Sequence, residues 1–342
     1  MQYRSIGATE MKASAVVLGT WGMGGWMWGG CDDSLAERTI LTALDAGINI
    51  IDTAPIYGFG RSEETVGRAL QSRQRDQVII ASKCGLYWNY FPLPADHGEW
   101  HCYSNDQGLT ETLEKYVVYR WLRPEIIRQG VEDSLRRLKT DYIDIMQVHH
   151  VGDRTTPIAD TMGELEELKR EGKIRAIGIS NATKAQLCEY ASCGVLDVDQ
   201  ERYSMLDRNV EKNGVLDACK EKGVSFFAYS PLENGLLTGK LSPDTVFKPG
   251  DLRLNNPQFS KENITRVNTA LERIAEIAGR FSLTIPQFSA AWILARYEKA
   301  FVLCGSRSPD HILDNSLAGN VSIDSDSLAE VDSILDELHL LK

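Results

Sequence analysis

The chain alternates short apolar segments with longer amphipathic ones along its 342 residues. The apolar segments are rich in valine, isoleucine and alanine, as expected of parallel strands buried on both faces. We expect strands at 17–20, 48–54, 77–83, 142–149, 174–180, 196–203, 224–230 and 301–305. Because helical segments separate these strands, neighbouring strands run parallel, and the pattern predicts an α/β fold of the (β/α)8 TIM-barrel type.

The amphipathic segments predict helices with recognisable starts and stops. We expect them at 32–47, 62–71, 123–139, 158–173, 183–194, 210–223, 264–282, 286–297, 309–319 and 325–338. Asp33 or Ser34 is the predicted N-cap of the first helix, and Ser62 opens the second. The sequence contains no Pro/Ser-rich linker and no low-complexity tract, so we predict a single domain over 1–342 with extra helices near the C-terminus.

A doubly wound dinucleotide-binding fold is the main alternative to a barrel. It requires a G-x-G-x-x-G turn directly after the first strand. The segment GTWGMGGW has Gly22 and Gly24, but the position three residues beyond Gly24 is Met27. The sequence therefore lacks this fingerprint, and we expect the glycines to form a loop at the barrel mouth.

Composition excludes several classes of partner. The net charge is −11, which argues against nucleic acid, and no apolar run approaches the length needed to span a membrane. The first residues lack an apolar leader, so we expect a cytoplasmic protein, a monomer or homo-oligomer.

The seven cysteines have no C-x2-C spacing, and His97 and His101 do not form an H-E-x-x-H motif. We expect no metal.

Four polar residues interrupt or follow the apolar strands: Asp52, Tyr57, Lys83 and His149. Singly, each is explained as a cap, a solvated strand end or a packing residue. In a parallel barrel, however, the C-terminal ends of the strands share one mouth, where all four can meet. A nearby ammonium would lower the pKa of a tyrosine and make it a better acid, so the set predicts proton donation to an oxygen. Side chains cannot supply hydride, so a nicotinamide is implied.

Several motifs carry a family resemblance over nearly the whole chain. They include IDTAPIYGFGRSEETVGRAL (51–70), ASKCG (81–85), SLRRLKTDYIDIMQVHH (134–150), EGKIRAIGISN (171–181) and FFAYSPLENGLLTGK (226–240). The chain resembles the aldo-keto reductases, and most closely their bacterial branch with a GLLTGK segment. The resemblance implies a catalytic tetrad at Asp52, Tyr57, Lys83 and His149. It also implies a dinucleotide bound across the barrel mouth.

The resemblance also implies the residues that bind the cofactor and the substrate. The cofactor-binding set comprises Gly19, Thr20, Trp21, Asp52, Ser180, Asn181, Gln200, Tyr229, Ser230, Leu232, Gly235, Leu237, Gly239, Lys240, Gly305, Ser306, Arg307, His311, Asp314 and Asn315. The substrate-binding set comprises Trp21, Tyr57, Trp88, His149 and His150. An arginine fork at Arg307 suits a 2′-phosphate, which favours NADPH/NADP+ with NADH/NAD+ as the alternative. His311 departs from the Gln or Arg that relatives often carry.

The aromatic-rich segment 84–122 follows the third strand and is expected to rise over the barrel mouth. It is interpreted as a lid or substrate loop, with a self-packed loop or a subunit contact as the alternatives. His150 stands where relatives often have tryptophan, which would make the pocket more polar.

The predicted reaction is NAD(P)H-dependent reduction of an aldehyde or ketone, including sugar-derived carbonyls, with the proton from Tyr57. The alternatives are an NAD(P)+-dependent sugar dehydrogenase and a cofactor-binding regulatory subunit like those of ion channels.

Overall fold

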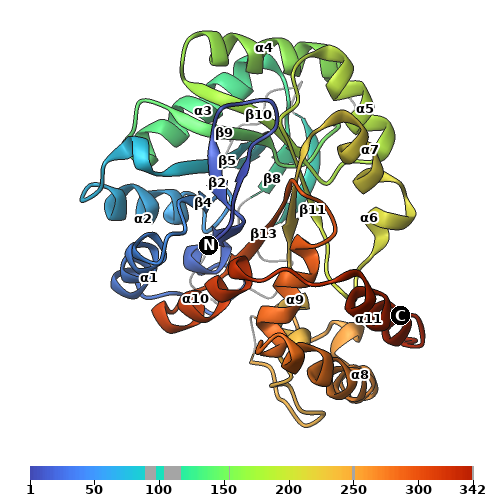
Figure 1. Cartoon of the computed structure of the whole chain (residues 1–342). Helices are drawn as coiled ribbons and strands as arrows, with labels where there is room; N and C mark the ends of the chain where they lie inside the picture. The colour runs from blue at the N-terminus through green and yellow to red at the C-terminus, as the bar shows by residue number, and fades with distance from the viewer. Residues whose placement is uncertain (89–97, 104–116, 154, 249–250, 341–342) are drawn as a thin grey trace.

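The computed structural model describes residues 1–88, 98–103, 117–153, 155–248 and 251–340 of the chain. Its centre is a closed barrel of parallel strands (Figure 1). Around the barrel the strands are β3 (Val16–Gly19), β4 (Ile50–Asp52), β5 (Ile79–Cys84), β9 (Ile143–Val148), β10 (Ile174–Ser180), β11 (Val198–Arg202), β12 (Ser225–Tyr229) and β13 (Ala300–Gly305). Pairing of β13 with β3 closes the circle. The predicted (β/α)8 barrel is confirmed.

Helices surround this barrel (Figure 1). The surrounding helices are α1 (Asp33–Asp45), α2 (Arg61–Leu70), α3 (Pro124–Leu138), α4 (Ile158–Arg170), α5 (Lys184–Cys193), α7 (Val215–Lys222), α9 (Ile285–Leu294) and α10 (Pro309–Ser316). Beside α7 lies the short α6 (Asn209–Lys212). Two further helices, α8 (Lys261–Arg280) and α11 (Ser325–Asp336), pack on each other outside the ring. They account for the extra C-terminal helices that the sequence predicted.

The barrel interior is apolar in its lower half. Val17, Ile50, Ile145, Val198 and Phe227 belong to one buried cluster there. A short antiparallel hairpin, β1 (Tyr3–Ser5) with β2 (Lys12–Ser14), precedes the barrel and adds buried side chains to this cluster. Because its strands have only three residues each, they are too short to show a periodic hydrophobic pattern.

Two residues further along the strands, the inward-facing side chains become polar. Asp52 follows Ile50, Gln147 follows Ile145, Gln200 follows Val198 and Tyr229 follows Phe227 on the same faces. The polar layer is therefore at the C-terminal end of the barrel, the end at which barrels of this architecture carry their sites.

Three predicted details of the helices are wrong. The N-cap of α1 is Asp32, whose carboxylate accepts from the Leu35 amide at 2.7 Å, because adjacent acids compete for this role. Helix α2 begins after Gly60, and the buried hydroxyl of Ser62 instead bonds with Thr20 at 2.7 Å. The segment 210–223 is broken into α6 and α7, with Gly214 in the left-handed region between them.

The segment 84–122, interpreted from the sequence as a lid or substrate loop, contains regular structure. Three antiparallel strands, β6 (Leu86–Trp88), β8 (Val117–Arg120) and β7 (Glu99–Tyr103), form a small sheet beside the barrel. Residues 89–97, which include His97, and residues 104–116 lie outside the described part of the chain. Leu86 and His101 bring this sheet to the large cavity at the barrel mouth.

None of the described helices combines the length and the apolar character that crossing a membrane requires.

Candidate active site

A buried ion pair joins the ends of the neighbouring strands β4 and β5. The Lys83 ammonium lies 2.7 Å from Oδ1 of Asp52, and both side chains are almost fully buried. The same ammonium donates to the Thr53 carbonyl oxygen at 3.0 Å. Burial lowers the pKa of Lys83, while the charge and hydrogen bond of Asp52 raise it. Because either charge alone would be costly at this depth, the pairing offsets much of the cost of burying the two groups.

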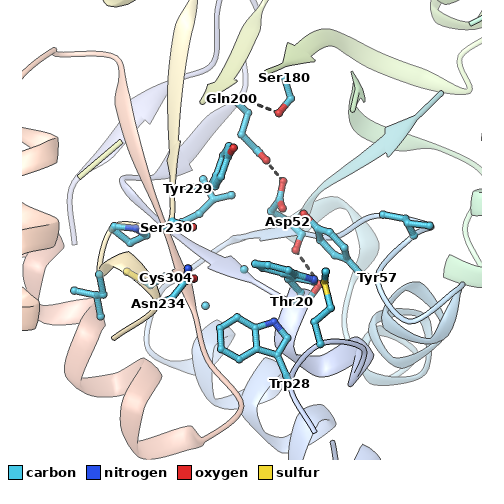
Figure 2. Close-up of a pocket in the computed structure, with 18 of the residues that line it drawn as sticks. Thr20, Trp28, Asp52, Tyr57, Ser180, Gln200, Tyr229, Ser230, Asn234 and Cys304 are labelled. Carbon is cyan, nitrogen blue, oxygen red and sulfur yellow. Dashed lines mark hydrogen bonds between the residues drawn. The ribbon is translucent and has the colours of Figure 1, made fainter. Parts of the chain in front are cut away.

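Two amide side chains hold the second oxygen of Asp52. Gln200 Nε2 donates to Oδ2 at 2.8 Å and Gln147 Nε2 donates to the same atom at 3.3 Å. Figure 2 shows the Gln200 side chain pointing toward Asp52, with this hydrogen bond drawn as a dashed line. The sequence had predicted Gln200 as a cofactor ligand and had not identified Gln147. These bonds fix the carboxylate from the side opposite Lys83.

Tyr57 is positioned by a close contact between two loops. It lies between β4 and α2, and a Cβ on Gly24 would stand only 2.4 Å from the Tyr57 carbonyl carbon. Gly58 meets the Gly24 carbonyl in turn, with a φ of +67°. The glycines after β3 therefore let the backbone pass close to the Tyr57 loop, and only glycine fits there.

The Tyr57 ring is close to both other ionisable groups. Its centroid lies 4.9 Å from the Lys83 ammonium and 5.8 Å from the His149 ring, which it meets edge to face. The pKa of Tyr57 is raised well above its usual range, by burial first and by the Asp52 charge second. The net shift is therefore opposite to the expected lowering, because burial and the Asp52 charge decide its direction. Tyr57 rests as a protonated phenol, which is the form that donates.

His149 follows β9 and is neutral at physiological pH. Its pKa lies well below the usual value because of burial first, and then because of the nearby charge of Lys83. Its backbone amide bonds to the Cys84 carbonyl at 3.0 Å, which continues the pairing of β9 with β5. A neutral imidazole can donate a hydrogen bond to a carbonyl oxygen without carrying charge.

Ser180, Asn181 and Tyr229 form a second hydrogen-bonded group at the mouth. Asn181, in the left-handed region with a φ of 58°, donates from Nδ2 to the His149 carbonyl at 3.0 Å. The Tyr229 hydroxyl donates to Asn181 Oδ1 at 2.7 Å, and the Ser180 hydroxyl donates to the Gln200 carbonyl at 2.7 Å. These groups are therefore fixed before any ligand arrives.

One cavity of about 610 Å³ lies over these residues (Figure 2). Most predicted site residues line it: Gly19, Thr20, Trp21, Asp52, Tyr57, His149, His150, Ser180, Asn181, Gln200, Tyr229, Ser230, Leu232, Gly235, Gly305, His311 and Asn315. It extends from the Asp52 corner to α10. A Cβ on Gly305 would meet no atom within 4 Å, so the backbone there is open to a ligand. Amide groups at one end and an open glycine at the other fit an extended dinucleotide.

Other predicted residues do not line this cavity. Lys83 is behind Asp52, Leu237 is buried, and Gly239 and Lys240 are exposed. Ser306 bonds to the Ser308 carbonyl at 2.8 Å, and Asp314 accepts from the Gln287 side chain at 2.7 Å. Trp88 packs on Phe59 and lines a separate cavity of about 200 Å³.

Arg307 is occupied by a neighbouring loop. Its Nη1 donates to the carbonyl oxygens of Trp28 and Gly30, each at 2.9 Å. A Cβ on Gly22 would lie 3.3 Å from the Arg307 stem, so the side chain runs along the loop that carries Trp21 and Trp28. The arginine is exposed at the outer end of the site, and its Nε and Nη2 are not used in these bonds.

Several residues that line the cavity were not predicted from the sequence. Arg253 and Asn234 meet at the mouth, where Arg253 Nη1 donates to the Asn234 carbonyl at 3.2 Å and Asp251 pairs with the same guanidinium at 2.7 Å. The other unpredicted members are Met27, Ile56, Leu86, His101, Pro231, Leu303 and Cys304. Only the left-handed Asn234, in an ENG segment, carried a usable turn signal.

Comparisons with known proteins agree with this geometry. The model of the Aldo/keto reductase family matches residues 15–336. The NADH-specific methylglyoxal reductase of Escherichia coli (strain K12) is 40% identical over 322 residues, covering 93% of each chain. Aldo-keto reductase YhdN of Bacillus subtilis (strain 168) is 36% identical, covering 98% of this chain and 94% of that one. The solved glycerol dehydrogenase AKR11B4 from Gluconobacter oxydans superposes with a TM-score of 0.85 at 37% identity, covering 98% and 95% of the two chains.

Proposed function

The chain belongs to the Aldo/keto reductase family and is an NAD(P)-dependent oxidoreductase, and we propose that Tyr57 is the proton donor when it reduces an aldehyde or ketone to an alcohol. The observation that carries the role of Tyr57 is its position, between the Lys83 ammonium and the His149 ring. A phenol with a raised pKa holds its proton until a neighbouring oxygen becomes more basic than itself.

The surrounding residues have distinct tasks in this proposal. His149, as a neutral imidazole, donates a hydrogen bond to the carbonyl oxygen and orients it toward Tyr57. Lys83 stabilises the phenolate that remains after proton transfer, and Asp52 keeps Lys83 charged and fixed. A bound nicotinamide supplies the hydride for the carbonyl carbon.

The residues suited to hold the dinucleotide form two groups. Ser180, Asn181 and Gln200 offer amide and hydroxyl groups for a carboxamide, and Tyr229 offers a ring face beside them. At the outer end, Gly305, His311 and Asn315 on or before α10 suit the adenosine. Arg253 brings a positive charge to the cavity, so we assign it to the pyrophosphate in preference to the exposed Lys240.

The choice between NADPH and NADH depends on Arg307. Its Nε and Nη2, which take no part in the bonds to Trp28 and Gly30, suit a 2′-phosphate, which supports NADPH. Its Nη1 is already bonded to two carbonyl oxygens, and the Escherichia coli relative is NADH-specific, which supports NADH. We propose that the chain accepts both dinucleotides. Comparing KM for the two in one assay tests this.

The test of the proposed reaction is consumption of either reduced dinucleotide with a panel of carbonyl compounds. Methylglyoxal, 4-nitrobenzaldehyde and open-chain sugars span dicarbonyl, aromatic and hydroxylated substrates. Tyr57→Phe removes only the donor hydroxyl, so we expect kcat to fall about 10²- to 10⁴-fold. Binding of the dinucleotide, read from quenching of the pocket tryptophans, is expected to stay within about twofold of wild type, because the ring remains.

Tyr3→Phe is the matched control, since Tyr3 is exposed at the opposite end of the barrel and its hydroxyl donates to the Gly47 carbonyl. It should leave kcat unchanged. An unchanged kcat in Tyr57→Phe would exclude Tyr57 as the donor. Tight dinucleotide binding without turnover of any carbonyl would instead favour a regulatory role.

The reverse reaction is a second candidate, supported by the solved glycerol dehydrogenase to which the chain is similar. The same residues serve both directions, with Tyr57 accepting the proton from an alcohol. Oxidation of glycerol with NAD+ or NADP+ as the only added oxidant tests it directly.

A further inference from the structure

Three histidine rings form a continuous row along one wall of the large cavity. The His149 and His150 rings stack with centroids 5.3 Å apart and an interplanar angle of 13°. The His101 ring, carried by β7, lies 4.7 Å from the His150 ring. All three residues line the cavity that contains Tyr57. The row therefore begins at the reacting corner and leads away from it.

The outer two rings are uncharged at physiological pH. Burial and the nearby His101 and Arg120 lower the pKa of His150 to about 4. Burial and the charge of Arg120 also lower the pKa of His101. Each neutral imidazole keeps one N–H donor and one acceptor nitrogen. Such a pair matches a hydroxyl group, which both donates and accepts.

These nitrogens are available to a ligand. Within the part of the chain that the structure describes, no residue hydrogen-bonds the imidazole nitrogens of His101 or His150. Both residues are half-buried, so their polar atoms are partly withdrawn from water without gaining a protein partner. A polar group in this condition favours a ligand that supplies the missing hydrogen bond.

The residues on the other flank of Tyr57 are apolar and aromatic. The Trp21 ring lies 6.3 Å from the Tyr57 ring and meets Trp28 edge to face at 5.3 Å. A substrate at Tyr57 therefore has a carbon-binding surface on one flank and imidazoles on the other. A simple alkyl or aromatic carbonyl compound uses only the first of these.

We propose that His101 and His150 form a hydroxyl-binding subsite for a carbonyl substrate that carries hydroxyl groups on the carbons beyond its carbonyl. This inference rests on the proposed carbonyl reduction and names its substrate class, short polyhydroxylated aldehydes and ketones. His150 is placed for the hydroxyl nearest the carbonyl, because it adjoins His149. His101, one ring further along the row, is placed for the next hydroxyl of the chain.

The experiment compares D-glyceraldehyde with propanal, which has the same carbon chain without hydroxyls. The measured quantity is the ratio of their kcat/KM values in wild type, His150→Phe, His101→Phe and the double variant. We expect each single substitution to lower the ratio about three- to tenfold, as for loss of one hydrogen bond, and the double to lower it further. Hydration of the aldehydes cancels, since each ratio is compared between variants. His150→Gln, which keeps a donor and an acceptor, should restore part of the ratio.

His339→Phe, at an exposed position far along the chain, is the matched control and should leave the ratio unchanged. Turnover of 4-nitrobenzaldehyde, which has no hydroxyl, is measured in the same variants to show whether they remain active. If the variants remain active and the ratio stays at the wild-type value, the subsite does not exist.

A binding measurement separates this inference from the proposed reaction. Glycerol and 1-propanol are titrated into the complex with oxidised dinucleotide, and quenching of the pocket tryptophans is followed. Preference for glycerol that is lost in His150→Phe supports the subsite even if no carbonyl is reduced, in which case only the proposed reaction fails. Equal binding of the two alcohols by the wild type overturns the subsite.

Discussion

Two sites in this barrel bury carboxyl side chains in different electrostatic surroundings. The first site contains Asp52, and the second contains Asp199 and Glu201. Asp52 faces the interior and is paired with Lys83 at 2.7 Å. Asp199 and Glu201 face outward from β11, on either side of the inward-facing Gln200, and Asp199 contacts the Cys219 thiol of α7 at 3.6 Å. Within the described residues, no lysine or arginine forms an ion pair with Asp199 or Glu201. Burial is similar, so the partner makes the difference.

The pKa values of the second group show the consequence. Burial raises the pKa of Asp199 to about 7, and burial together with the charge of Asp199 raises that of Glu201 to about 9. With both pKa values raised, Asp199 and Glu201 together retain a proton at neutral pH. Glu201 still accepts from the Ala182 amide at 2.6 Å, directly after the Ser180–Asn181 turn. The Asp52–Lys83 site thus holds a charged pair beside Tyr57. The Asp199–Glu201 site retains a proton, and Glu201 holds the loop at Ala182.

Removing the Lys83 ammonium should leave Asp52 as a buried carboxyl group without a cationic partner, like Asp199 and Glu201. The resulting losses of stability and activity are the largest effects we expect. In Lys83→Met, Asp52 remains buried without its partner and takes up a proton. We expect the free energy of unfolding to fall by about 3–5 kcal/mol. Carbonyl reduction should fall about a thousandfold, because the Tyr57 phenolate loses its neighbouring positive charge. Urea unfolding and steady-state kinetics measure the two effects.

The double variant Asp52→Asn/Lys83→Met is the control for this comparison. It removes both charges, so it should regain most of the lost stability while staying inactive. If Lys83→Met alone unfolds at the wild-type urea concentration, the ion pair is not what stabilises Asp52.

A smaller effect on stability is expected from the titration of Asp199 and Glu201. In the folded chain these carboxyl groups have raised pKa values, so the folded state binds more protons than the unfolded state between about pH 4 and about pH 9. Stability contributed by this pair is therefore present at low pH and is lost as pH rises through that window. Glu201→Gln cannot lose a proton but keeps an oxygen for the Ala182 amide. At pH 9 we expect the free energy of unfolding of Glu201→Gln to exceed that of the wild type by about 2 kcal/mol. At pH 5 we expect the two free energies of unfolding to differ little.

Urea unfolding at pH 5, 7 and 9 checks this dependence. Glu10→Gln, at an exposed position near the N-terminus, is the control and should follow the wild-type pH curve. A Glu201→Gln curve that runs parallel to wild type would mean that Glu201 is ionised in the folded chain.

The first site was largely readable from the sequence, for a physical reason. Asp52 and Lys83 directly follow apolar runs, and a charge at the end of a buried strand requires a partner. Parallel strands of one barrel place such ends together, so periodicity alone brought Asp52, Lys83 and His149 to one mouth. The barrel itself followed from the same alternation.

The remainder required three-dimensional information. The strand at 198–202 has polar residues on both faces, so periodicity could not separate Gln200 from Asp199 and Glu201. His101 lies in β7 of a three-stranded sheet, and the three strands of this sheet are far apart in the sequence. The direction of the Tyr57 pKa depends on how burial and Asp52 together outweigh Lys83, and a sequence contains none of these distances.

The smallest effects we expect come from the two amide side chains that donate to Asp52, those of Gln200 and Gln147. Gln200→Leu removes the 2.8 Å bond to Oδ2, whereas Gln147→Leu removes the 3.3 Å bond to the same atom. We expect Gln200→Leu to reduce the free energy of unfolding by about 1 kcal/mol and kcat by about tenfold, because the carboxylate keeps Lys83 but loses its better donor. Gln147→Leu should have a weaker effect on both, since its bond is longer. The same urea and kinetic measurements compare them, and a larger loss in Gln147→Leu would show that the Asp52 carboxylate is held chiefly from β9.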